Sequence, residues 1–112
     1  MTLVNLTPHA LMIVIDRETG KTITVPPTGK VARVTTIREP GAFHDGVPTF
    51  KVTFGSVTGL PDMELGKVFV VSGMVASHPS VRQRPDVFSP GELIRDAGGI
   101  VVGCHGLVCA LE

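Results

Sequence analysis

The sequence predicts a mainly β fold, a compact small barrel or sandwich of about seven or eight short strands, with room for one short helix near residues 73–80. Val, Ile and Thr account for 34 of the 112 residues, and these β-branched residues suit strands better than helices. Gly and Pro add 22 more, which leaves few uninterrupted windows for a long helix. The length predicts a single β-dominated domain over residues 1–110.

The first half of the chain is predicted to contain five strands, at residues 3–7, 10–16, 21–25, 30–37 and 49–54. The second and third of these form a hairpin. In the fifth, Phe50, Val52 and Phe54 alternate with polar residues, so we expect them to face inward. Residues 39–46 and 55–66 are interpreted as loops because Gly and Pro interrupt them.

The second half begins with residues 67–71, which are apolar on both faces and are predicted to form a central strand covered on both sides. Residues 73–78 either continue this strand or form one helical turn. Residues 79–91 are predicted to be irregular. Residues 93–96 and 100–104 are predicted to form a hairpin, because the turn between them is rich in glycine. A short strand at residues 107–110 follows Gly106.

Composition argues against several classes of partner. Ten Lys and Arg balance ten Asp and Glu, so we expect no nucleic-acid partner. The apolar stretch at residues 68–76 is too short to span a membrane, and the start of the sequence lacks the pattern of a signal peptide. Two cysteines are too few for a disulfide scaffold. We therefore expect a cytoplasmic domain without a cofactor, in which Leu111 and Glu112 could be left from cloning.

Six short segments of the sequence form a set that can be compared with known families. They are Asn5-Leu6-Thr7-Pro8-His9, Pro26-Pro27-Thr28-Gly29-Lys30-Val31-Ala32-Arg33-Val34, Gly59-Leu60-Pro61, Val70-Val71-Ser72, Arg84-Pro85-Asp86-Val87 and Asp96-Ala97-Gly98-Gly99-Ile100-Val101-Val102-Gly103-Cys104. In this order and spacing, over nearly the whole chain, they resemble an uncharacterised family of small proteins from actinobacteria and their phages. The resemblance implies that source and no assigned activity. By analogy with phage proteins that sequester nucleotide immune signals, it suggests a nucleotide-like ligand.

Six residues are candidates for binding an anion: Thr7, His9, Arg33, His78, Arg82 and Arg84. Arginine offers a planar fork to a phosphate or carboxylate, and histidine titrates near neutral pH. Each candidate also has a structural explanation. His9 could be an ordinary turn histidine, and Arg33, if buried, would need Asp86 or Asp96 as a partner. Arg84 and Asp86 could form a local pair in a solvated loop.

Catalytic and metal motifs are weak. The segment at residues 28–30 lacks the full phosphate-loop pattern, and neither C-x-x-C nor H-E-x-x-H occurs. Adjacent strand residues such as Cys104 and His105 point to opposite faces, so no metal site is predicted. A small hydrolase or metal-assisted enzyme that uses His9 with Cys104 or His105 stays open as an alternative.

The sequence therefore predicts a non-enzymatic binding domain, either for a small anionic molecule or for a protein surface. A structural, oligomeric component of a phage or its host is a further alternative. We expect a homo-oligomer in each case, because a small sheet with apolar edges needs to cover them.

Overall fold

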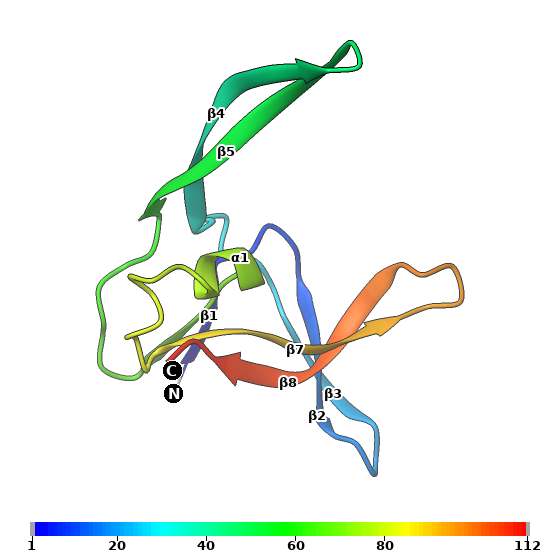
Figure 1. Ribbon diagram of the computed structural model, residues 1–112. Coiled ribbons are helices and arrows are strands. Elements are labelled where there is room, and N and C mark those ends of the chain that lie inside the picture. The colour runs from blue at the N-terminus through cyan, green and yellow to red at the C-terminus, as the bar shows by residue number, and fades with distance from the viewer. Residues whose placement is uncertain (1, 112) are drawn as a thin grey trace.

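The computed structural model describes residues 2–111 and shows a mainly β fold, as the sequence predicts (Figure 1). Six strands form one curled, half-barrel sheet and two form a separate hairpin. In spatial order the sheet contains β1 (Thr2–Asn5), β6 (Lys67–Val70), β7 (Val87–Arg95), β8 (Val101–Cys109), β2 (Leu11–Asp16) and β3 (Lys21–Val25). The hairpin contains β4 (Arg33–His44) and β5 (Val47–Thr58). The short helix α1 (Gly73–Ala76) confirms the predicted helical turn.

The sheet is mixed. β6 runs parallel to both β1 and β7, and β2 runs parallel to β8, whereas β7–β8 and β2–β3 are antiparallel hairpins. β6 lies between β1 and β7, and Val68, Phe69 and Val70 are buried. This confirms the covered, apolar strand that the sequence predicts there.

The hydrophobic core is small and lies where α1 packs beside β6 and β7. Its buried members are Leu6, Ala32, Phe69, Val71, Val75, Ala76, Val81, Val87 and Ala110. Most of them come from the segment between β6 and β7 and from the ends of strands. The outer parts of the long hairpins therefore contribute little to the core.

The β4–β5 hairpin is longer than predicted. Its two strands have twelve residues each and meet at Asp45 and Gly46, whose φ angles are 50° and 78°. Two consecutive positive φ angles are what the tightest hairpin turns need. A bulge between Pro40 and Phe43 absorbs the break that the sequence analysis interpreted as a loop. The predicted loop at residues 39–46 is therefore wrong except for its turn, whereas the loop predicted at 55–66 is found at 59–66, after β5 ends at Thr58.

The expectation that Phe50, Val52 and Phe54 face inward is also wrong. The three side chains do share one face of β5, but they are 48%, 50% and 60% exposed. Alternation in a strand decides which residues share a face. It does not decide whether another layer covers that face.

β7 and β8 are also longer than predicted. β7 begins at Val87, within the segment expected to be irregular, and β8 continues through Gly106 instead of stopping there. Gly106 lies within β8 with a φ of 64°, a backbone conformation that a residue with a side chain rarely adopts. The turn at residues 96–99 is as predicted. Leu111 is exposed, and Glu112 lies outside the described residues.

The molecule is extended for its size. Its radius of gyration is 16.8 Å, whereas a compact domain of this length has about 13 Å. Its accessible surface is 7518 Å², whereas a compact monomer of 11.8 kDa exposes about 5,900 Å². The projecting hairpins of Figure 1 account for this shape.

Candidate functional site

One face of the β4–β5 hairpin is apolar and uncovered. We call it the hairpin face; its apolar members are Pro40, Phe43, Pro48, Phe50, Val52 and Phe54. Cross-strand pairs such as Phe43–Pro48 and Pro40–Phe50 place these side chains together. Arg38 is the one charged residue described on this face, and its guanidinium carbon lies 3.8 Å from the centroid of the Phe50 ring. The guanidinium thus stacks on an aromatic ring.

The opposite face of the same hairpin is mainly polar. Glu39 lies across from Lys51, and Ile37 lies across from Thr53. The hairpin is therefore amphipathic, although neither face is covered by the rest of the described chain along most of its length (Figure 1).

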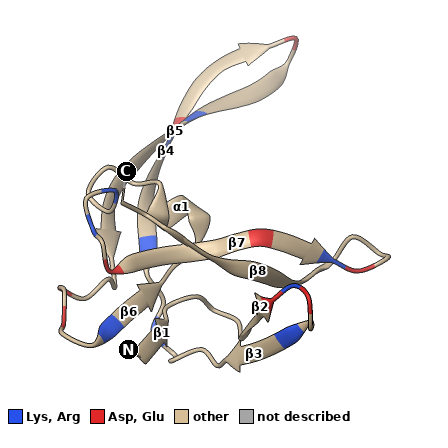
Figure 2. Cartoon of the chain, turned by 90° about the horizontal axis from the view of Figure 1, so that it is seen from below, with Lys and Arg blue, Asp and Glu red and all other residues tan. Residues whose placement is uncertain are grey.

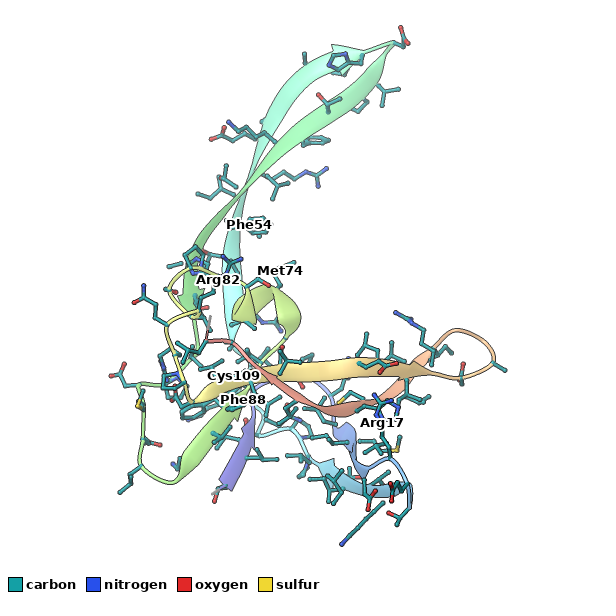
Figure 3. The ribbon with its side chains drawn as sticks, turned by 60° about the horizontal axis from the view of Figure 1, so that its bottom comes forward. Arg17, Phe54, Met74, Arg82, Phe88 and Cys109 are labelled. Atoms are coloured by element: carbon teal, nitrogen blue, oxygen red, sulfur yellow. The ribbon has the colours of Figure 1, made fainter. Side chains whose placement is uncertain are left out.

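The base of the hairpin is held by His78. The Nε2 atom of His78 lies 2.8 Å from the carbonyl oxygen of Gly55 and donates to it, and the backbone N–H of Ser80 donates to Nδ1. These partners assign the neutral Nε2–H tautomer. Phe54 on the hairpin and Met74 on α1 flank a small hollow beside this contact (Figure 3). His78 therefore anchors the hairpin and has both ring nitrogens engaged.

A second apolar surface lies inside the curl of the sheet. This hollow, which we call the trough, has a volume of about 490 Å³. Its lining consists of Thr7, His9, Ala10, Leu11, Met12, Ser72, Gly73, Pro90, Leu93, Val101, Val102, Gly103 and Cys104. None of these described residues is Lys, Arg, Asp or Glu. Leu93, Val101 and Val102 are 48%, 45% and 45% exposed, so the trough has open apolar walls.

Thr7 and His9 both line the trough, but Thr7 is engaged in a turn. The buried Asn5 side chain accepts hydrogen bonds from the backbone N–H of Thr7 at 2.9 Å and from its hydroxyl at 2.6 Å. The Asn5 amide nitrogen donates to the carbonyl oxygens of His9 and Val25. This network fixes the turn and leaves the exposed His9 ring at the rim of the trough.

Arg33 is exposed at the start of β4. It lines a separate hollow of about 280 Å³ together with Thr7 and Met74. The two carboxylates considered as its partners are engaged elsewhere. Asp86 binds Arg84, and Asp96 accepts hydrogen bonds from backbone N–H groups of its own turn.

Arg84 and Asp86 form the local pair that the sequence analysis considered. Arg84 donates to both carboxylate oxygens of Asp86 at 2.7 Å, and also to the carbonyl oxygen of Pro61 at 3.0 Å. The hydrogen bond from Arg84 holds the pKa of the Asp86 carboxyl below its usual range, and the same bond raises the pKa of Arg84. Because Arg84 also binds Pro61, the pair joins its own segment to the loop that follows β5.

Arg82 lies on yet another surface, near Cys109 and Ser89 (Figure 3). The six predicted ligand residues thus occupy several places. Thr7 is shared by the trough, where it accompanies His9, and by the hollow of Arg33. His78 and Arg82 line two further hollows, and Arg84 is paired with Asp86. They do not surround one common hollow.

Charges are interspersed over the molecule. Figure 2 shows Lys and Arg mixed with Asp and Glu along the strands and loops. One exposed pair joins Arg17 to Glu92 at 2.6 Å and lowers the pKa of Glu92. No helix in the described part of the chain is long and apolar enough to cross a membrane.

Two of the three residues considered for the alternative enzyme line one hollow, and the third does not. His9 and Cys104 line the same trough, which the sequence alone could not show. Burial raises the pKa of the Cys104 thiol, and this disfavours the nucleophilic thiolate. His105 has a buried Nδ1 without a hydrogen-bond partner, and within residues 2–111 no group of three His, Cys, Asp or Glu could hold a metal ion.

Comparison with known proteins adds no assignment. The chain matches no family model, no curated protein and no solved structure. The resemblance to actinobacterial and phage proteins therefore stays a prediction, and function has to be argued from the residues.

The local sequence patterns did not predict the hairpin face or the trough. A signal for the first was present, since Asp45-Gly46 between apolar segments is a strong indication of a tight hairpin turn. The trough has no comparable signal, because residues from three strands and two connecting segments form it only in the folded chain.

Proposed function

We propose that this protein is a non-enzymatic binding domain that acts as a homo-oligomer. Its docking element is the hairpin face, and the protein surface to which this face binds belongs to a second copy of the chain. One observation carries the proposal: the β4–β5 hairpin projects from the body with an amphipathic pattern whose apolar side nothing in the described chain covers.

A hairpin of this kind gains little stability on its own. Two-stranded hairpins are marginal in water unless a further layer covers one face. Phe43 is 72% exposed on the hairpin face, in addition to Phe50, Val52 and Phe54. Contiguous exposed apolar patches on small proteins generally mark interaction sites. The alternation in β4 and β5 is therefore explained by a partner.

The amount of surface fits an oligomer. The chain exposes 7518 Å², against about 5,900 Å² for a compact monomer of its mass. The excess of about 1,600 Å² exceeds the roughly 800 Å² that each partner contributes to a standard interface. Each copy therefore has enough surplus surface for one or two contacts with other copies.

Charge also favours association between copies. The formal net charge is zero, so copies do not repel one another at long range. Arg38 stacks on Phe50, so its charge lies against a ring at the edge of the contact. Binding through this face buries rings and aliphatic groups without isolating a carboxylate.

Binding of a small anionic molecule and enzymatic activity have less support. A small anionic ligand would need converging cations, but Arg84 is held by Asp86 and His78 by Gly55 and Ser80. An enzyme would need an activated group, and the buried Cys104 thiol has a raised pKa. Binding to a protein surface has more support, because both the uncovered hairpin face and the excess accessible surface favour it.

The test compares two matched double variants of the same hairpin. Phe50→Thr with Val52→Thr removes apolar groups from the hairpin face, and Ile37→Thr with Val47→Thr removes them from the opposite face. Threonine preserves strand propensity in both. We expect light scattering after size exclusion to show an oligomer for the wild type and the control, and a monomer for the face variant. A monomeric wild type at high micromolar concentration, or an oligomeric face variant, would overturn the proposal.

A further inference from the structure

We infer that the trough of one copy is the surface that receives the hairpin face of the next copy. This inference rests on the proposed function, since it names the receptor for the docking element. The contact it describes joins two different surfaces of the same chain, one projecting and one hollow.

The two surfaces match in size. The trough has a volume of about 490 Å³. A cavity of about 150 Å³ is enough to hold one benzene molecule, so the trough has room for about three aromatic rings. The hairpin face carries three, of which Phe43 and Phe50 lie in its outer part and Phe54 lies at its base beside Met74. Phe43 lies opposite Pro48, two residues from Phe50, so these two rings are diagonal neighbours and can enter together.

The two surfaces also match in chemistry. The described lining of the trough contains no Lys, Arg, Asp or Glu, so the one charge that the contact brings with the rings is the Arg38 guanidinium stacked on Phe50. Leu93, Val101 and Val102 supply aliphatic walls that are about half exposed without a partner. Met12 adds a flexible thioether, which packs well against aromatic rings.

The hairpin of the same copy is not placed to fill the trough. The β4–β5 hairpin and the β7–β8 hairpin extend from the body in different directions (Figure 1). The longest dimension of the molecule is 54 Å, as expected for arms that point apart. A second copy therefore has to donate the rings. Because the contact joins unlike surfaces, it gives a ring where the rotation between copies closes and an open filament where it does not, unless two copies exchange hairpins reciprocally as a two-fold dimer.

In the competing arrangement, the hairpin faces of two copies pack against each other. Mixtures of variants distinguish this arrangement from binding of the hairpin in the trough. The trough variant is Leu93→Lys with Val102→Lys, which puts charges into the hollow and faces them with Arg38 of an incoming hairpin. Its control is Ile100→Lys with Val108→Lys, which changes two exposed residues outside the trough, one in the turn before β8 and one near the end of β8. The protein mixed with the trough variant is the face variant, Phe50→Thr with Val52→Thr.

Native mass spectrometry reports each protein alone and the equimolar mixture. We expect the face variant and the trough variant to be monomers alone, with self-association weakened at least tenfold, and the control to remain oligomeric. The mixture should contain a mixed dimer, because the face variant still has its trough and the trough variant still has its hairpin. Circular dichroism confirms folding, and Leu93→Thr with Val102→Thr replaces the trough variant if the lysines prevent it.

The outcomes distinguish the inference from the proposed function. If the trough variant oligomerises like its control while the face variant does not, the hairpin binds elsewhere and only the inference fails. If both variants are folded monomers and no mixed dimer forms, the trough is not the receptor. If the face variant still oligomerises, the proposed function fails as well.

Discussion

At the scale of single residues, Asn5 organises the turn that was first considered as a binding motif. It is completely buried, and both ends of its amide are used. Thr7 and His9 thus owe their positions to a neighbouring side chain. This network favours the structural explanation that the sequence left open for this motif, in which His9 is an ordinary turn histidine.

Asn5→Ala should therefore destabilise the protein substantially. The variant loses four side-chain hydrogen bonds, including those to the Thr7 N–H and the Val25 carbonyl, whereas the His9 carbonyl keeps the bond from the Thr7 hydroxyl. We expect the free energy of unfolding to fall by about 2–4 kcal/mol. Urea unfolding monitored by circular dichroism measures it, with Thr19→Ala in an exposed turn as the control. An equal effect of the two substitutions would contradict the role of Asn5.

The Arg84–Asp86 pair makes stability depend on acid. The folded pKa of Asp86 lies below the value of about 3.9 that an unfolded Asp has. The pair therefore stabilises the fold fully above that unfolded value, and this contribution is lost as the pH falls through the folded pKa. Asp86→Asn should lower stability at neutral pH by about 2 kcal/mol, because a charged hydrogen-bonding partner is lost.

The decisive measurement is the difference in stability between wild type and Asp86→Asn as a function of pH. We expect this difference to be constant near neutral pH and to shrink in acid. Glu92→Gln removes the exposed partner of Arg17 and serves as the control, with little effect expected from a pair open to water. A difference for Asp86→Asn that does not change with pH would count against the linkage.

At the scale of secondary-structure elements, glycine explains how β7 and β8 run so long beside each other. A Cβ atom at Gly91 would collide with the carbonyl oxygen of His105 and lie 2.9 Å from that of Gly106. Only a residue without a side chain allows this close approach. The strand continues through Pro90 and Gly91, a pair that the sequence analysis interpreted as the end of an irregular segment.

Gly91→Ala should therefore weaken the β7–β8 hairpin. We expect a loss of about 1–3 kcal/mol, because the new methyl group forces the two backbones apart. Gly73→Ala is the matched control, since a Cβ atom there meets nothing within 4 Å at the start of α1. Thermal unfolding of both variants gives the comparison. A destabilisation by Gly91→Ala no larger than that by Gly73→Ala would contradict the role of close approach at position 91.

At the scale of the whole molecule, a small core is combined with a large surface. The core cluster lies beside α1, and the hairpins extend beyond it. A domain of this length can bury enough apolar surface to fold. In this protein, many of the apolar side chains lie outside the core, on the hairpin face and in the trough. Contacts between copies would supply the missing burial.

Stability should consequently depend on protein concentration. In an oligomer that dissociates on unfolding, dilution favours the unfolded chain by mass action. For chains of this length we expect Tm to rise by about 3 °C for each tenfold increase in concentration. Calorimetry of the wild type over two decades of concentration tests this. The face variant, Phe50→Thr with Val52→Thr, should show a Tm that is lower and independent of concentration.

The sequence determined the fold class and the approximate positions of most strands. β-branched composition, turn residues and alternation act over a few neighbours, so they can be recognised without a structure. The same local information predicted the turn at residues 96–99, the buried strand of Val68–Val70 and the short helix at α1. It also indicated that Arg84 and Asp86 could pair, because only one residue separates them.

Tertiary structure alone decided which apolar faces are covered. Phe50, Val52 and Phe54 alternate as core residues do, and they are exposed because no layer packs on them. The trough is likewise assembled from segments as distant as Thr7 and Cys104. Burial depends on contacts between distant parts of the chain, and between copies, which a local pattern cannot encode. The candidate binding surfaces are therefore a property of the folded molecule.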